Sequence, residues 1–127
     1  MNAPLERLML VEDDNDIRTV AVMALEMVGG LKVQACETGT AALAAVKAFD
    51  PQLVLLDVMM PGMSGPEVLR TLRQDAQTFG LPVVFMTAKV QTEEVEALRR
   101  LGAVDVIAKP FDPMTLADQV KAIWSRI

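Results

Sequence analysis

Five side chains that can take part in metal and phosphate chemistry stand directly after short apolar runs of the sequence. Two of these runs end in acids, Glu12 with Asp13 and then Asp57, and two others end in Thr87 and Lys109. Carboxylates that come close together repel one another, so a fold keeps such a cluster mainly to bind a hard cation such as Mg²⁺. A hydroxyl and an ammonium group would suit the remaining oxygens of a phosphoryl group. The pattern therefore predicts a carboxylate beside a metal, placed to receive phosphate.

Four of these residues also have an ordinary structural role open to them when each is taken alone. Asp13 could cap a helix, and Asp57 could form a turn hydrogen bond. Thr87 could be a turn hydroxyl, and Lys109 could be a solvated lysine. The joint pattern is harder to account for in this way, because charged groups that perturb one another cluster at functional sites.

The segments that must position these side chains alternate between strand and helix patterns. The run at 53–56 is apolar at every position, which is typical of a strand covered on both faces. Burying an unpaired charge is costly, so Asp57 is expected where this strand emerges at its carboxyl end. The predicted strands are residues 8–11, 32–36, 53–57, 82–86 and 104–108, with 32–36 near an edge of the sheet.

Capping residues and apolar spacing define five predicted helices, which follow the strands. The expected N-caps, in chain order, are Asn15 or Asp16, Thr38 or Thr40, Ser64, Thr92 and Asp112. The expected buried faces are Ile17, Val20, Ala24 and Met27 in the first helix, Val68, Leu69 and Leu72 in the third, and Leu116, Val120, Ile123 and Ile127 in the fifth.

Alternation of strands and helices implies the α/β class, with a parallel sheet covered by helices on both faces. In such sheets, sites form outside the carboxyl ends of the strands. The length of 127 residues fits one domain, 1–127, in which we expect residues 1–6 to be a short, loosely held lead-in.

Composition narrows the function further. A net charge of −5 without a basic run argues against a nucleic-acid surface, and a single cysteine excludes an internal disulfide framework. No apolar run is long enough to span a membrane, and the N-terminus lacks a signal pattern, so we expect a cytoplasmic protein. The chain has no histidine, so any phosphohistidine must belong to a partner.

Four segments carry a resemblance to a known family: Leu-Val-Glu-Asp-Asp at 10–14, Leu-Leu-Asp-Val-Met-Met-Pro-Gly-Met-Ser-Gly at 55–65, Met-Thr-Ala at 86–88 and Lys-Pro-Phe at 109–111. With them the chain resembles the receiver domain of two-component response regulators, of the single-domain chemotaxis-regulator type, over essentially its whole length. The resemblance implies a flavodoxin-like, doubly wound sheet of five parallel strands in order 2-1-3-4-5 with five helices.

The resemblance also implies a Mg²⁺ site. Asp13 and Asp57 would bind the ion directly, and Glu12 would act mainly through water. Met59 would contribute only its backbone carbonyl, so its side chain does not matter for the metal.

The implied reaction is phosphoryl transfer from the phosphohistidine of a sensor histidine kinase or histidine phosphotransfer protein. Asp57 would be the phosphoacceptor, while Thr87 and Lys109 would bind phosphoryl oxygens. In the family the peptide before Pro110 is cis. Such a protein catalyses only its own phosphorylation and dephosphorylation, so it is not an enzyme acting on a separate substrate.

The implied output is a change in the binding of a downstream protein through the fourth helix, fifth strand and fifth helix. Two positions depart from the usual pattern of the family. Val106 stands where an aromatic residue usually responds to the phosphorylated state. Asp105 faces Gln119 where dimerising members carry arginine, so we expect a monomer or weak dimer.

Three alternatives remain at this stage. A haloacid-dehalogenase-type hydrolase needs a second aspartate where this chain has Met59. A flavin carrier of the flavodoxin type needs a phosphate cradle where residues 12–14 are acidic. A receiver-like interaction module that does not use phosphate would have no need of the acid, Thr87 and Lys109 set.

Overall fold

The computed structural model describes residues 3–127. Its strands are β1 (Arg7–Val11), β2 (Lys32–Cys36), β3 (Leu53–Asp57), β4 (Val83–Thr87) and β5 (Asp105–Ala108). Its helices are α1 (Asn15–Met23), continued by a π-helical turn η1 (Ala24–Val28), α2 (Gly39–Phe49), α3 (Gly65–Gln74), α4 (Thr92–Arg100) and α5 (Leu116–Ser125).

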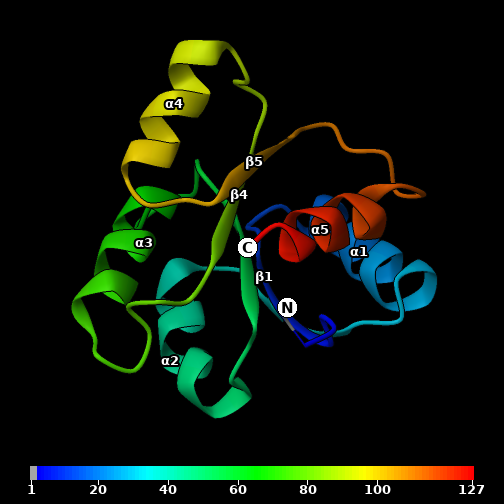
Figure 1. The fold of residues 1–127 in the computed structure, drawn as a ribbon, viewed down its shortest axis with the longest axis horizontal. Helices are drawn as coiled ribbons and strands as arrows, with labels where there is room; N and C mark the ends of the chain where they lie inside the picture. The colour runs from blue at the N-terminus through cyan, green and yellow to red at the C-terminus, as the bar shows by residue number, and fades with distance from the viewer. Residues whose placement is uncertain (1–2) are drawn as a thin grey trace.

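The strands form one parallel sheet in the order β2-β1-β3-β4-β5, which confirms the predicted fold class and the edge position of β2. Helices α1 and α5 cover one face of the sheet, and α2, α3 and α4 cover the other (Figure 1). The strand order reverses between β1 and β3, so their carboxyl ends are neighbours at the switch point where such folds place ligands.

Two apolar cores hold these layers together. In β1, Leu8 and Leu10 pack toward α1 and α5, while Met9 and Val11 pack toward α2 and α3. All five residues of β3 are buried, as its continuous apolar run predicts. The central strand is therefore held from both faces, which fixes the position of its last residue.

The N-caps of α2 and α3 are confirmed. Thr38 accepts a hydrogen bond from the amide of Ala41, and Ser64 forms a reciprocal capping box with Glu67. The expected cap of α1 is wrong: Asp14 accepts from the amides of residues 16 and 17, both at 2.9 Å. The acidic run offers several candidate caps, and Asp14, the acid immediately before the first helical residue, takes the role.

The caps expected for α4 and α5 are also wrong. Thr92 is the first residue of α4, and Gln91 precedes it. Asp112 accepts from the amide of Met114 at 2.9 Å and so forms a local turn, and α5 begins only at Leu116. A short aspartate can bond the backbone two residues ahead, which competes with helix initiation.

The buried faces of α3 and of most of α5 are confirmed, whereas that of the first helix is wrong at two of its four positions. Val20 and Met27 are 41% and 77% exposed, and Ala21 and Leu25 are buried in addition to the expected Ala24. At the end of this helix α5 approaches closely, since a Cβ on Gly29 would lie 2.6 Å from the Cβ of Ala117. The π-helical turn η1 interrupts the α-helical spacing on which the prediction rests, and Met27 lies within this turn.

The chain termini also depart from expectation. Ile127 lies beyond the end of α5 and is 49% exposed. Residues 3–6 are held in place, since Leu5 is buried and the indole of Trp124 donates to the carbonyl of Ala3 at 2.7 Å. The loosely held lead-in is therefore wrong for these four residues, and residues 1–2 lie outside the described part. Within residues 3–127, no helix is long and apolar enough to cross a membrane.

Candidate functional site

The carboxyl ends of four strands bring the predicted site residues to one edge of the sheet. Glu12 and Asp13 follow β1, Asp57 ends β3, Thr87 ends β4, and Lys109 follows β5. The register pairs Asp57 with a β4 residue one position before Thr87. Glu12, Asp57 and Thr87 are buried, and the other two are half-buried. The fold thus shields most of these polar side chains from solvent.

Three carboxylates face one another at this edge. One oxygen from each of Glu12, Asp13 and Asp57 lies within 4.8 Å of the other two. Carboxylate oxygens are the protein ligands that Mg²⁺ prefers, and it usually takes one or two of them together with water and phosphate oxygens. The donor set and its spacing therefore fit a divalent cation.

The ammonium group of Lys109 offsets part of the negative charge of these acids. Its Nζ lies 2.8 Å from Glu12 Oε1 and 3.2 Å from Asp57 Oδ1. The peptide that joins it to Pro110 is cis, as the resemblance implies. Lys109 therefore bridges the acid that follows β1 and the acid that ends β3.

Burial and neighbouring charges shift the pKa values of Asp57 and Lys109. Burial raises the pKa of Asp57 to about 6, the negative charge of Glu12 adds to the increase, and Lys109 opposes it. Burial acts to lower the pKa of Lys109, but its hydrogen bond to Glu12 and the charges of both acids outweigh that effect and raise it. At neutral pH the lysine is charged, and most Asp57 carboxyl groups are ionised.

Thr87 presents a hydroxyl beside the acids. Its Oγ1 accepts a hydrogen bond from the amide of Lys89 at 3.0 Å, which leaves its own hydrogen available to donate. Met59 lies in the loop after β3 and is 69% exposed.

Gly65 has a part in the site that the sequence did not lead us to expect. Its amide donates to the carbonyl of Val58 at 2.9 Å, and a Cβ at this position would lie 2.3 Å from the carbonyl oxygen of Asp57. The loop after β3 thus folds back closely over the backbone of Asp57. The sequence held a signal for this contact, because this glycine stands between a helix cap and Pro66.

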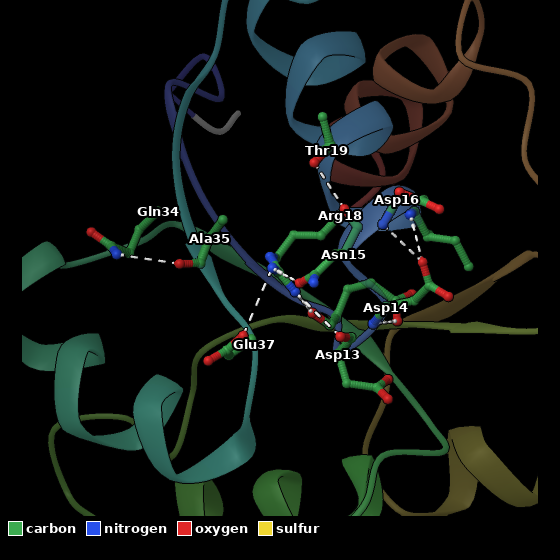
Figure 2. A network of polar contacts seen from close by, with 11 residues as sticks. Asp13, Asp14, Asn15, Asp16, Arg18, Thr19, Gln34, Ala35 and Glu37 are labelled. Atoms are coloured by element: carbon green, nitrogen blue, oxygen red, sulfur yellow. Dashed lines mark hydrogen bonds and ion pairs between the residues drawn. The ribbon is translucent and has the colours of Figure 1, made fainter.

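Arg18 is a second residue that sequence reasoning missed. It lies in α1, and its side chain reaches the acidic loop between β1 and α1 (Figure 2). Its partners there are backbone carbonyls, which a sequence pattern does not display.

A parallel five-stranded α/β sheet with an acidic cluster and a lysine at its switch point defines a phosphate-signalling module of the receiver type. The sequence profile of the response regulator receiver domain matches residues 8–121. The chain belongs to this family, which confirms the resemblance and the predicted function class. The hydrolase and flavin-carrier alternatives fall away with this match.

Relatives and solved structures agree with this assignment. The chain is 39% identical to the DNA-binding response regulator MtrA of Mycobacterium tuberculosis over 122 residues, which is 96% of this chain and 52% of MtrA. It is 37% identical over 119 residues to the phosphate regulon transcriptional regulatory protein PhoB of Pseudomonas aeruginosa, covering 94% and 52%. It thus spans about half the length of these relatives. The chemotaxis response regulator CheY4 of Vibrio cholerae matches with a TM-score of 0.86 at 26% identity, covering 94% of this chain and 98% of CheY4.

Proposed function

We propose that this receiver domain accepts a phosphoryl group on Asp57 from the phosphohistidine of a sensor histidine kinase or histidine phosphotransfer protein, in the presence of Mg²⁺. One observation carries the proposal. The Asp57 carboxylate ends a buried strand with the Lys109 ammonium 3.2 Å away and carboxylate oxygens of Glu12 and Asp13 within 4.8 Å. A nucleophile, a cation site and a fixed positive charge therefore share one edge of the sheet.

Each residue has a defined task in the transfer. An ionised Asp57 oxygen attacks phosphorus in line, the phosphorus–nitrogen bond of the phosphohistidine breaks, and its electron pair returns to the imidazole. Lys109 pairs with a phosphoryl oxygen, and the Thr87 hydroxyl donates to another. The product is an acyl phosphate, which water later hydrolyses to restore the carboxylate.

The metal-binding residues proposed are Asp13 and Asp57 directly, the Met59 carbonyl, and Glu12 through water. When bound, Mg²⁺ neutralises charge on the transferring oxygens. Lys109 holds the Glu12 carboxylate at 2.8 Å, which keeps this acid turned toward the site.

The remaining proposals concern partners and surroundings. Residues 1–127 would form one receiver domain located in the cytoplasm, which would bind a downstream protein through α4, β5 and α5 and would itself contact neither nucleic acid nor membrane. Asp105 forms ion pairs with Arg99 at 2.8 Å and Arg126 at 3.3 Å within the chain, which supports a monomer or weak dimer. The module would change only its own phosphorylation state.

Phosphorylation with acetyl phosphate and Mg²⁺ tests the acceptor. Wild type should acquire a label that is stable in acid and lost in base, as expected of an acyl phosphate. Asp57→Asn should abolish the label, because an amide is a poor nucleophile. Asp14→Asn is the matched control and should label normally, since asparagine also caps helices well. Labelling of the Asp57 variant at the wild-type level would place the nucleophile elsewhere.

A further inference from the structure

Arg18 is fixed by oxygens on two neighbouring loops at the edge of the site (Figure 2). Its Nη1 donates to the carbonyl oxygen of Glu12 at 2.9 Å and to that of Asp13 at 3.3 Å. Its Nη2 donates to Asn15 Oδ1 and lies 3.8 Å from Glu37 Oε2, in the loop after β2. The side chain is only 20% exposed. These contacts hold the guanidinium in a single place.

The two carbonyl groups that Arg18 binds flank the α-carbon of Asp13. The Glu12 carbonyl belongs to the peptide plane before this α-carbon, and the Asp13 carbonyl belongs to the plane after it. Each peptide unit is planar, so fixing both planes fixes the backbone dihedrals of Asp13 and the direction of its Cβ. The second plane is also held by the amide of Asp14, which donates to Glu12 Oε2 at 3.1 Å.

The Asp13 side chain extends away from Arg18 (Figure 2), on the side where its carboxylate approaches Asp57. Asp13 is half-buried and leaves the sheet just as the chain enters a loop, so strand pairing alone does not fix it. The Arg18 guanidinium restrains Asp13 from the side of the backbone opposite the Asp13 carboxylate.

We propose that Arg18 is a positioning residue for the metal site: through the backbone it holds the Asp13 carboxylate opposite Asp57, without touching the ion or the phosphoryl group. This inference rests on the proposed function, because it concerns the Mg²⁺ site. Arginine suits the task, since its planar guanidinium presents several donors in fixed directions. A lysine has one compact ammonium group and could not keep the contacts of both Nη atoms.

The positive charge of Arg18 and the restraint that Arg18 places on the Asp13 backbone have opposite effects on Mg²⁺ affinity. A cation near the metal site competes electrostatically with Mg²⁺, so loss of the charge alone would tighten Mg²⁺ binding. Loss of the restraint would weaken binding, and groups that orient metal ligands commonly contribute about 10–100-fold to affinity. Because Arg18 lies on the far side of the Asp13 backbone from the carboxylate, the loss of restraint outweighs the loss of charge. Weaker Mg²⁺ binding in a variant without Arg18 therefore indicates loss of the restraint, whereas tighter binding indicates loss of the charge alone.

Titration with Mg²⁺, followed by NMR, tests the inference on Arg18→Gln, Arg18→Lys and the control Glu37→Gln, at a temperature where each is folded. Both Arg18 variants should bind Mg²⁺ about tenfold more weakly than wild type. The control should stay within about twofold, because the contact to Glu37 is long and Glu37 is exposed. The acetyl phosphate labelling rate of Arg18→Gln should recover at saturating Mg²⁺, which a general structural defect would not produce.

A second readout uses metal-free protein. In Arg18→Gln the backbone order parameters of residues 13–15 should fall below those of wild type. Tighter Mg²⁺ binding in Arg18→Gln, wild-type affinity in Arg18→Lys, or unchanged order in this loop would each overturn the inference. If wild type itself binds no Mg²⁺, the proposed function fails, and the order parameters still decide whether Arg18 restrains the loop.

Discussion

Helices α3 and α4 each begin a few residues beyond a strand that ends in a site side chain, Asp57 before α3 and Thr87 before α4. The start of α3 is firmly held. Ser64 and Glu67 form a capping box, Gly65 packs against the Asp57 backbone, and further residues of the helix are buried. The end of the connection after the proposed phosphoacceptor is therefore tightly packed.

The start of α4 is held by much less. Within the described chain, Gln91 makes no side-chain cap, and no residue of α4 is buried. Residues 88–91 are exposed, and the amide of Lys89 bonds the very hydroxyl of Thr87 that we expect to turn toward phosphate. Few buried contacts mean a low cost of local rearrangement. We infer from this comparison that one connection holds the proposed acceptor in place while the other can move in response to its phosphorylation.

Gly65→Ala, at the start of α3, should produce the largest loss of stability. Its Cβ would lie 2.3 Å from the carbonyl oxygen of Asp57 and 2.9 Å from the ring of Phe85, and the backbone contact cannot be relieved by a rotamer change. We expect a loss of about 3 kcal/mol in the free energy of unfolding, measured by urea denaturation. Gly80→Ala is the control, with nothing within 4 Å of its Cβ, and should stay within about 0.5 kcal/mol of wild type. Equal stability of the two variants would show that the connection after β3 is not tightly packed.

Asp57→Asn should stabilise the metal-free protein at neutral pH. The folded state raises the pKa of Asp57 from 3.8 to about 6, so the fold favours the protonated carboxyl. That stability is complete below about pH 4 and is lost as the pH rises through about 6. The full shift corresponds to about 3 kcal/mol, and asparagine should recover about 2 kcal/mol of it above pH 7.

Denaturation from pH 4 to pH 8 with a chelator present measures this difference. The two stability curves should separate only as the pH rises. A gap of constant size across this range would contradict the assigned cause.

Ser64→Ala should give the smallest change that still distinguishes the two helices. Loss of the cap should cost about 1 kcal/mol in the free energy of unfolding. Gln91→Ala, at the cap of α4, should cost only a few tenths of a kcal/mol, because in the described structure this cap makes no side-chain hydrogen bond. Thermal melts of both variants measure the difference, and an equal cost would remove the contrast between the two starts.

The sheet could be predicted from the sequence because the signals for its strands are local and strong. The run at 53–56, just before Asp57, is apolar at every position, and a strand covered on both faces is the element that buries so short a run completely. The site followed from the same logic, since parallel strands place their carboxyl ends together. The reasoning failed where the outcome depends on competition between neighbours, as when Asp14 caps α1 in place of Asn15 or Asp16. It also missed Arg18, because backbone carbonyls are present at every residue and carry no pattern.

The most direct test of the account uses beryllofluoride, a phosphoryl mimic, in NMR of wild type, Thr87→Ala and Thr87→Ser. In wild type we expect large amide shifts at 88–94 and little movement of the Val106 methyl groups, because valine is too short to fill the space that an aromatic would take. Thr87→Ala should reduce the shifts at 88–94 and leave those at 58–65 unchanged, while Thr87→Ser should keep both. If 88–94 stays still while Val106 changes rotamer, or if 58–65 moves with Thr87, the account is wrong.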